Sequence, residues 1–289
     1  MKKIMNFLKL IRLKHWLKNL LVFFPLIFNL QLFNFNSFIK VALGFLSFCF
    51  ISSSIYIIND IRDVEKDRKH EVKKKRPIAA GIISIKEALI ISLLLTIISV
   101  LLNLLFINNI NGLLLIILYY LLNIGYSFGL KNIPIVDIVI LVSGFVIRVL
   151  YGASITSIEI SNWLYLAVMS GSFFMGFGKR RNEIMKQGNN SRKVLMYYTK
   201  EYLDKFMYVC LILSIMFYSL WSIDSLTTQR FGDYMVYTIP MVLVIFMKYC
   251  LDIEGDSYGD PVDVVTSDKV LMVLILLFAI IMFLIMYVL

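Results

Sequence analysis

The sequence predicts an all-α membrane protein, a polytopic bundle of nine transmembrane helices that form a single integral-membrane domain over residues 1–289. Hydrophobic residues make up 60% of the 289 residues, well above the roughly 45–50% of soluble domains. They stand in long continuous runs, whereas a transmembrane β-barrel would show short segments of alternating polarity. Charged residues concentrate between the runs, so each run is predicted to cross the bilayer.

Each predicted span is a run of about 20 mostly apolar residues, the length of helix that crosses a bilayer. Pro25 interrupts the first run and predicts a tilt or a kink at that point. The nine predicted spans cover residues 19–33, 38–58, 87–107, 112–129, 135–154, 162–178, 205–222, 233–251 and 270–289.

The distribution of positive charge predicts the topology. The chain has 29 Lys and Arg against 19 Asp and Glu, a net charge of +10. Most basic residues fall in segments 1–19, 59–86, 129–134 and 179–204, which share one side of the membrane if the N-terminus is inside. Basic residues mark cytoplasmic loops, so we expect a multi-pass protein of the cell inner (plasma) membrane with its active site facing the cytoplasm. Topology accounts for the charge, and no nucleic-acid partner is expected.

The segment directly after the second run carries the strongest functional signal. It contains Asn59, Asp60, Asp63 and Asp67, followed by a basic run. The three aspartates fall at i, i+3 and i+7, so a helix would place them on one face. Clustered carboxylates repel one another, and a hard cation such as Mg²⁺ relieves this repulsion. The motif therefore predicts a Mg²⁺ site that handles a diphosphate, while a solvated face balanced by the following lysines remains the alternative.

Basic residues next to this motif have two interpretations. The run from Lys73 to Arg76 is compatible with a positive-inside anchor and with phosphate contacts. Arg76-Pro77 precedes Ala79-Ala80-Gly81, which predicts a turn back into the membrane. Arg76 is then placed to reach a phosphate.

Ionisable residues in the middle of the chain leave similar alternatives open. Asp137 lies just inside an apolar run and predicts either a functional carboxylate or an intramembrane salt bridge. Lys131 is either a topology anchor or a phosphate ligand. Arg148 lies three turns deeper than Asp137, and it either pairs with a carboxylate or meets an anionic substrate.

Two further basic clusters flank apolar runs. Lys179, Arg180 and Arg181 fit phosphate binding and fit a stop-transfer cluster equally well. Near the N-terminus, Arg12 and the following Lys14 and Lys18 predict either an anchor helix or recognition of a lipid phosphate at headgroup depth. The acidic last loop, 252–263, is compatible with solvation and with a second cation contact.

The N-D-x-x-D-x-x-x-D pattern at Asn59–Asp67, with nine spans, resembles the UbiA superfamily of intramembrane prenyltransferases over essentially the whole chain. Further motifs resemble its decaprenyl-phosphate phosphoribosyltransferase branch. They are R-x-K-x-W-x-K-N at Arg12–Asn19, D-R-K-H-x-x-K-x-x-R-P-I-A-A-G at Asp67–Gly81, Y-S-F-x-L-K at Tyr126–Lys131, G-F-V-I-R at Gly144–Arg148, G-K-R-R-x-E at Gly178–Glu183 and G-D-P-V-D-V-V-T-S-D at Gly259–Asp268.

This resemblance implies a polyprenyl phosphate acceptor, a phosphoribosyl diphosphate donor and Mg²⁺ as cofactor, with the membrane lipids as surroundings. Asp60, Asp63 and Asp67 would hold the metal and carry catalysis, and the lipid phosphate would attack the ribose C1 with inversion. Lipid-phosphate contacts fall to Arg12, Lys14 and Lys18. Substrate binding falls to Asn59, Lys73, Arg76, Tyr126, Lys131, Asp137, Arg148, Lys179 and Arg180. The sequence indicates no oligomeric state.

Two positions depart from related patterns. Ordinary prenyltransferases repeat Asp four residues after their second acidic position, whereas Leu141 follows Asp137 here. This departure fits the phosphoribosyl branch and puts a second full metal site in doubt. Glu71 stands where the branch usually has proline. The alternative function is transfer of a polyprenyl chain from its diphosphate to an aromatic acceptor such as 4-hydroxybenzoate.

Overall fold

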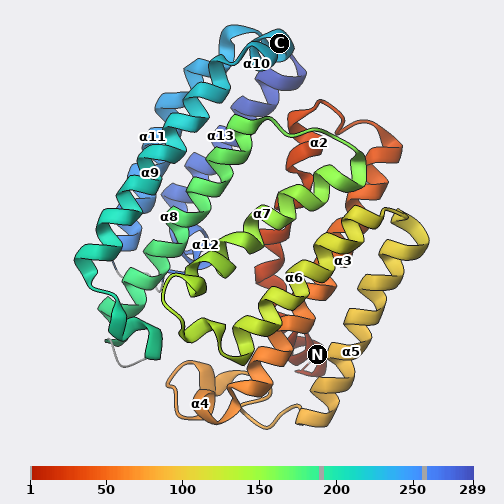
Figure 1. Cartoon of the computed structure of the whole chain (residues 1–289), viewed down its shortest axis with the longest axis vertical. Coiled ribbons are helices and arrows are strands. Elements are labelled where there is room, and N and C mark those ends of the chain that lie inside the picture. The colour runs from red at the N-terminus through yellow and green to blue at the C-terminus, as the bar shows by residue number, and fades with distance from the viewer. Residues whose placement is uncertain (1, 189–191, 256–258) are drawn as a thin grey trace. The chain divides into compact units, whose positions relative to one another are not determined.

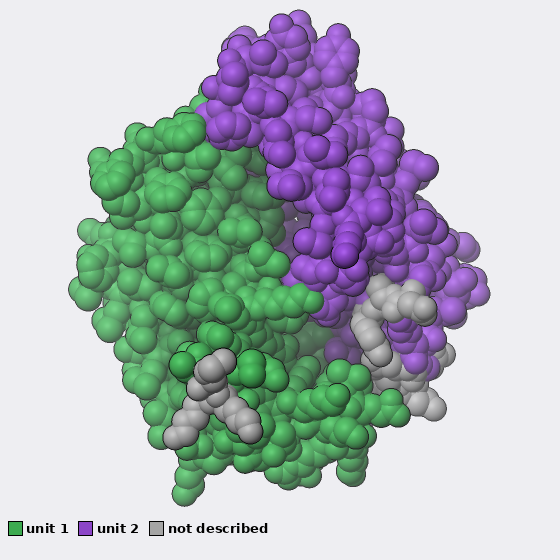
Figure 2. Space-filling model, turned by 180° about the vertical axis from the view of Figure 1, so that it is seen from behind, with its two compact units in different colours: residues 1–131, 147–158 green, residues 132–146, 159–289 purple. Residues whose placement is uncertain are grey.

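The computed structural model describes residues 2–188, 192–255 and 259–289. Within these ranges every regular element is a helix, as the apolar runs predict (Figure 1). Contacts group the chain into two compact units, coloured separately in Figure 2. Unit 1 comprises Met1–Lys131 and Ile147–Ile158, and unit 2 comprises Asn132–Val146 and Glu159–Leu289.

Unit 1 is built on three long helices and the N-terminal segment that packs on them. Its elements are α1 (Lys2–Leu10), η1 (Leu13–Phe23), α2 (Phe24–Phe28), α3 (Phe35–Arg62), α4 (Val64–Arg68), η2 (Lys73–Lys75), α5 (Ile85–Leu102), η3 (Asn103–Ile107), α6 (Ile110–Phe128) and the second half of α7 (Val136–Thr156). The short turn η4 (Leu130–Asn132) follows α6.

Unit 2 starts with the first half of α7 and continues to the C-terminus. Its remaining elements are α8 (Asn162–Gln187), η6 (Lys193–Tyr197), α9 (Lys200–Ile223), α10 (Ser225–Phe231), η7 (Gly232–Thr238), α11 (Ile239–Glu254), α12 (Pro261–Ser267) and α13 (Lys269–Tyr287).

Seven helices in the described ranges are long and apolar enough to cross a membrane: Phe35–Arg62, Ile85–Ile107, Ile110–Phe128, Val136–Thr156, Lys200–Ile223, Ser225–Glu254 and Lys269–Tyr287. The all-helical membrane class is confirmed, and each of these helices overlaps a predicted span. The other two predicted spans differ in form. Residues 19–33 belong to the short elements η1 and α2, with Pro25 in the first turn of α2. The span 162–178 is the first part of α8, which runs on to Gln187 and ends before Gly188 at φ 72°.

Polar residues of the loops determine where several helices begin. Ser84 and Glu87 form a reciprocal capping box at the start of α5. Side-chain oxygens of Asn34, Asn109, Thr199 and Asp268 accept backbone N–H groups at the starts of α3, α6, α9 and α13. These contacts satisfy N–H groups that lack a partner within the helix.

Small polar side chains join α3 to α5 in unit 1. Ser47 Oγ lies 2.9 Å from Ser99 Oγ, and Ser54 Oγ lies 2.8 Å from Ser92 Oγ. Asn103 extends the first contact by donating to Ser47 Oγ over 2.7 Å. Small residues let membrane helices approach closely while hydrogen bonds form between them. This contact fixes α3, whose C-terminal end carries the acidic motif.

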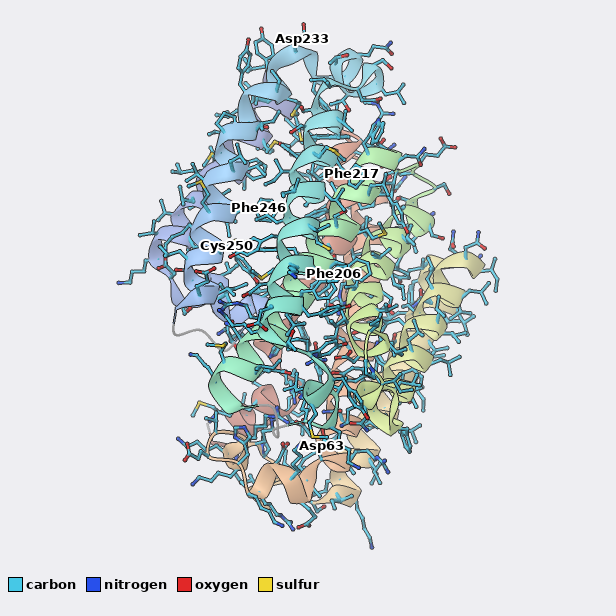
Figure 3. The ribbon with its side chains drawn as sticks, turned by 60° about the vertical axis from the view of Figure 1, so that its left-hand side comes forward. Asp63, Phe206, Phe217, Asp233, Phe246 and Cys250 are labelled. Carbon is cyan, nitrogen blue, oxygen red and sulfur yellow. The ribbon has the colours of Figure 1, made fainter. Side chains whose placement is uncertain are left out.

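Aromatic side chains hold α8 against α9 and α11 in unit 2, and Figure 3 labels Phe206 and Phe217 on α9 and Phe246 on α11. Phe174 of α8 meets Phe246 edge to face at 5.5 Å between ring centroids, and Phe177 stacks on Phe206 at 5.7 Å. Such ring pairs add to the stability that burial of their area provides. They fix the part of α8 directly before its basic cluster.

The close approach of Gly152 to a backbone carbonyl in unit 1 tests the packing of α7 on η1. A Cβ on Gly152 would lie 2.0 Å from the carbonyl oxygen of Val22. Backbone cannot rotate away, so we expect Gly152→Ala to destabilise the protein by at least about 1–3 kcal/mol. Gly171→Ala on α8 is the control, because its Cβ would meet only Ser214 Oγ at 3.1 Å. Thermal unfolding in detergent measures both, and equal melting temperatures would contradict the packing.

Two tyrosines of unit 2, the buried Tyr249 and the partly buried Tyr218, provide a second test. Among the residues that the structure describes, Tyr249 Oη is buried without a hydrogen-bond partner, whereas Tyr218 Oη lies 2.6 Å from Thr238 Oγ1. Removing a buried hydroxyl that lacks a partner relieves a desolvation penalty, while removing a bonded one loses about 0.5–1.5 kcal/mol. We therefore expect Tyr249→Phe to keep or raise the melting temperature and Tyr218→Phe to lower it. The reverse order would refute this hydrogen-bond assignment.

Candidate functional site

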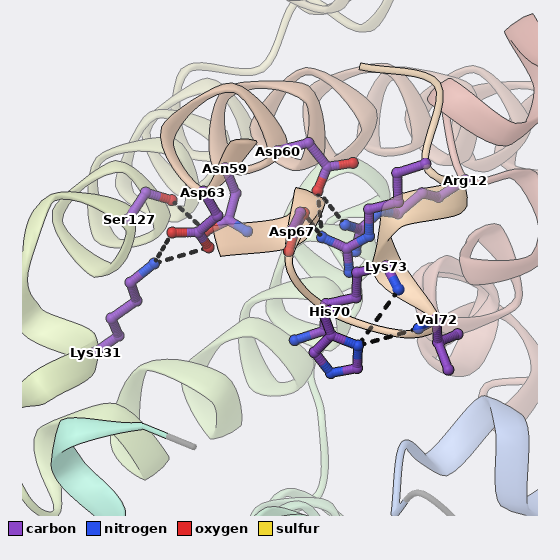
Figure 4. A network of polar contacts seen from close by, with 11 residues as sticks. Arg12, Asn59, Asp60, Asp63, Asp67, His70, Val72, Lys73, Ser127 and Lys131 are labelled. Carbon is purple, nitrogen blue, oxygen red and sulfur yellow. Dashed lines mark hydrogen bonds and ion pairs between the residues drawn. The ribbon is translucent and has the colours of Figure 1, made fainter. Parts of the chain in front are cut away.

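The acidic motif lies where α3 ends and α4 begins. Asn59 and Asp60 stand in the last turns of α3, Asp63 separates the two helices, and Asp67 lies in α4. A single helix, which would place the three aspartates on one face, does not form here, because α3 ends at Arg62 and α4 begins at Val64. Asp60 and Asp67 are buried, at 4% and 3% exposure, while Asp63 is partly exposed and points elsewhere (Figure 4).

One arginine joins the two buried carboxylates. Arg76 Nη1 donates to Asp60 Oδ1 over 2.9 Å and to Asp67 Oδ2 over 2.6 Å. Arg12 donates to the same Asp60 oxygen. Both arginines are partly exposed, whereas the carboxylates they neutralise are buried. Arg76 precedes the predicted turn, which the structure confirms through the hydrogen bond from Ala80 N to Arg76 O at 2.8 Å.

The third carboxylate has a different partner. Lys131 Nζ lies 2.8 Å and 3.0 Å from the two oxygens of Asp63 (Figure 4). Ser127 Oγ donates to Asn59 Oδ1 over 3.3 Å, next to Tyr126 in the last turn of α6. The structure thus brings Lys131 and Ser127 to the acidic motif, a contact that the two interpretations of Lys131, a topology anchor or a phosphate ligand, do not specify.

The fit of a divalent cation to this site is partial. Oxygens of Asp60 and Asp67 both lie within hydrogen-bond distance of one nitrogen of Arg76, and carboxylate oxygens are the donors that Mg²⁺ prefers. In the described ranges, no group of three His, Cys, Asp or Glu residues is arranged to hold a metal ion. The site therefore fits a cation between Asp60 and Asp67 once Arg76 withdraws, and Asp63 stands apart with Lys131.

Other predicted residues lie around this site in different ways. Lys73 lies in η2, where its backbone N–H and that of Val72 point to His70 Nδ1 at 3.5 Å and 3.2 Å. Lys14 is exposed and Lys18 partly exposed on η1. Arg12, by contrast, lies at the carboxylates with its guanidinium 4.8 Å from the ring centroid of Tyr56.

Arg148 is buried in unit 1 among polar groups and rings. Its Nε donates to Asn19 Oδ1 over 2.7 Å and its Nη2 to Tyr119 Oη over 3.0 Å. The guanidinium also lies 4.9 Å from the ring centroid of Phe48. Neither Asn19 nor Tyr119 is predicted from the sequence as a partner of Arg148, although a polar residue such as Asn19 at the start of an apolar run is a detectable signal.

In unit 2, Asp137 and Arg180 form a salt bridge with both side chains at 0% exposure. Arg180 Nε donates to Asp137 Oδ2 over 2.6 Å, and Tyr198 Oη donates to Asp137 Oδ1 over 2.7 Å. Arg180 Nη1 also donates to Glu183 Oε2 over 2.6 Å. Of the two interpretations of Asp137, the structure shows the salt bridge. Tyr198 and Glu183 were missed, though Glu183 lies three residues after Arg180, within reach on one helix face.

Glu183 remains charged because of its basic neighbours. Burial alone would raise its pKa, but Arg180, Arg192 and Lys179 outweigh burial and lower the pKa to about 2. The carboxylate is therefore ionised from neutral pH down to strongly acid conditions, and the Arg180–Glu183 ion pair persists over that range.

The acidic last loop supplies partners for lysines. Lys179 Nζ lies 3.2 Å from Asp260 Oδ2, and Lys248 pairs with Asp252 and with Asp268, the latter at 2.7 Å. Gly259, at φ 75°, lies against Lys179, where a Cβ would be 3.1 Å from the Lys179 Cα. Residues 256–258 of this predicted loop lie outside the described residues.

Comparisons with known proteins identify relatives over most of the chain. Residues 22–256 match the UbiA prenyltransferase family. A decaprenyl-phosphate phosphoribosyltransferase from Corynebacterium glutamicum is 37% identical over 278 residues, 93% of this chain and 83% of the relative. The enzyme of that name from Mycolicibacterium smegmatis is 34% identical, covering 93% of this chain and 88% of the relative.

Solved structures share the fold at lower identity. A UbiA homolog from Archaeoglobus fulgidus bound to DMAPP and Mg²⁺ superposes with a TM-score of 0.72 at 19% identity, covering 98% of this chain and 100% of the other. A structure of a digeranylgeranylglyceryl phosphate synthase gives a TM-score of 0.65 at 20% identity, covering 97% of this chain and 98% of the other. At this identity the likeness concerns the fold.

The Asp137–Arg180 pair yields a stability prediction. Asp137→Asn leaves a buried guanidinium without one of its two carboxylates, so we expect a loss of about 3–5 kcal/mol in the free energy of unfolding. Glu65→Gln is the control, because the Arg68–Glu65 pair is exposed and such pairs contribute about 0–1 kcal/mol. Thermal unfolding in detergent compares them. A small loss of stability with a large loss of activity would instead support direct substrate binding by Asp137.

Proposed function

Because the chain belongs to the UbiA prenyltransferase family and is a membrane-bound transferase, we propose that it transfers a 5-phosphoribosyl group from phosphoribosyl diphosphate to a polyprenyl phosphate and releases pyrophosphate. The observation that carries this proposal is the site at the end of α3, where buried carboxylates, two arginines and a lysine meet. The identity with the phosphoribosyltransferases over most of both chains supports the same reaction.

The residues of this site fit the needs of a diphosphate-leaving reaction. A bound Mg²⁺ would neutralise the charge that develops on the departing pyrophosphate. Asp60 and Asp67 would hold the metal, and Asp63 would hold Lys131 in position. Arg76 and Lys131, which contact these carboxylates in the structure, would turn to phosphate oxygens as donors of charged hydrogen bonds.

The acceptor chemistry agrees with the residues present. A lipid phosphate is already an anion, so its attack on the ribose C1 needs no strong general base. His70, the histidine of this loop, receives backbone N–H groups on Nδ1, and burial together with Lys73 lowers its pKa. These contacts hold the backbone of the loop, and the proposed reaction assigns no proton transfer to His70.

The remaining predicted residues complete the proposal. Lys14 and Lys18 on η1 would contact the lipid phosphate. Arg148 and Asn19, which are hydrogen-bonded to each other, would provide buried polar groups in unit 1. Lys179 would bind phosphate if Asp260 released it, while Arg180 would act through its salt bridges as a positioning residue. We place the reaction at the cytoplasmic face of the inner membrane, because the basic segments concentrate there in the predicted topology.

A turnover assay tests the proposed function. Purified protein in detergent receives Mg²⁺, labelled phosphoribosyl diphosphate and polyprenyl phosphate, and we expect label in the organic extract. Asp60→Asn should lower the rate by roughly 10²-fold or more, since it removes one of the two carboxylates that would hold the metal at the departing pyrophosphate. Glu65→Gln, in the same loop but paired with exposed Arg68, should keep the activity.

The outcome also separates the two reactions of the family. Absence of label in lipid, together with pyrophosphate release from a polyprenyl diphosphate and 4-hydroxybenzoate, would overturn the phosphoribosyl proposal in favour of prenyl transfer. Equal activity of Asp60→Asn and Glu65→Gln would remove the acidic motif from the mechanism.

A further inference from the structure

The acidic site is electrically balanced by the chain itself. Asp60, Asp63 and Asp67 carry three negative charges, and Arg12, Arg76 and Lys131 carry three positive charges at hydrogen-bond distance from them. The repulsion that would otherwise demand a metal is therefore already relieved. A divalent cation that entered while these three cations stayed in place would add two positive charges to a balanced site, which is electrostatically unfavourable.

The arginines and a metal ion compete for the same oxygens. Arg76 Nη1 lies between Asp60 Oδ1 and Asp67 Oδ2, and Arg12 takes the same Asp60 oxygen. A metal ligated by these two carboxylates would need the place of the guanidinium groups. Breaking ion pairs to buried carboxylates is strongly unfavourable unless a new partner receives the released charge.

The carboxylates of these ion pairs are more buried than the arginines that pair with them. Asp60 and Asp67 stand on helices and are buried at 4% and 3% exposure. Arg76 has an extended backbone and lies between η2 and the following turn. Arg12 lies between α1 and η1 and has a left-handed backbone at φ 52°. Their side chains are 26% and 18% exposed. The arginines can therefore swing outward while the carboxylates stay in place.

We propose that Arg12 and Arg76 are displaceable counter-ions of Asp60 and Asp67, so that a divalent metal enters the site together with a diphosphate and not before it. The diphosphate supplies the negative charge that draws the guanidinium groups off the carboxylates, and the metal then takes their place. Arg12 is thus a positioning residue of the metal site rather than a contact of the lipid phosphate. This inference relies on the proposed function only for its ligand class, a metal-bound diphosphate.

Equilibrium dialysis with Mn²⁺ and inorganic pyrophosphate tests the coupling on the full chain in detergent. We expect wild-type protein to bind Mn²⁺ weakly alone, and pyrophosphate to raise the amount bound at fixed free Mn²⁺ by about tenfold, a typical coupling between sites. In Arg76→Gln the carboxylates are partly released, so Mn²⁺ alone should bind more tightly than to the wild type. The increase caused by pyrophosphate should then shrink.

Arg68→Gln is the matched control. It removes one positive charge from the same loop, but Arg68 pairs with the exposed Glu65 rather than with the buried carboxylates. We expect its Mn²⁺ binding to follow the wild type. Arg12→Gln should change Mn²⁺ binding in the direction of Arg76→Gln, which keeps the test decisive if Arg76→Gln does not fold.

Two results would overturn the proposal. One is tight Mn²⁺ binding to the wild type without pyrophosphate, and the other is an equal effect of Arg76→Gln and Arg68→Gln. Because neither probe contains ribose or lipid, coupled binding without phosphoribosyl transfer would refute the proposed function and leave this inference standing. Transfer activity with uncoupled Mn²⁺ binding would do the opposite.

Discussion

The pairing of Arg76 with both Asp60 and Asp67 is the interaction on which the organisation of the acidic site depends. Two carboxylates buried at the end of a membrane helix need a cation, because their charge is poorly solvated there. The guanidinium groups of Arg76 and Arg12 supply this positive charge, and both come from segments outside the helix that carries Asp60. Arg76 precedes a turn, and Arg12 has a left-handed backbone between two helices. Loop structure in unit 1 thus follows from the requirement to neutralise two side chains.

In unit 2, a buried charge near the C-terminal end of α8 likewise needs partners of opposite charge. There Arg180 is the buried charge, and Asp137 and Glu183 are the carboxylates that surround it. The roles of acid and base are exchanged with respect to unit 1. Arg180 is fully buried, whereas Arg12 and Arg76 are partly exposed, so the network of unit 2 is suited to rigid support and the pairs of unit 1 to exchange.

The sequence predicted the helical class and most spans because a helix that crosses the bilayer needs a continuous apolar run of about 20 residues. It also placed Asp60, Asp67 and Arg76 in one loop region, and Lys131 in another loop on the same side of the membrane. It did not predict the break at Asp63, since neither proline nor glycine marks the end of α3 there. Nor did periodicity reveal that Arg12 pairs with Asp60, because the two residues are 48 positions apart and only tertiary packing brings them together.

The central claim is that Arg76 occupies the position that a metal takes when a diphosphate is bound. A cryo-EM structure of the full chain with Mg²⁺ and phosphoribosyl diphosphate measures this most directly. We expect the metal between the carboxylates of Asp60 and Asp67, with the Arg76 guanidinium on phosphate oxygens. A structure with both ligands bound and Arg76 still joined to both carboxylates would contradict the claim.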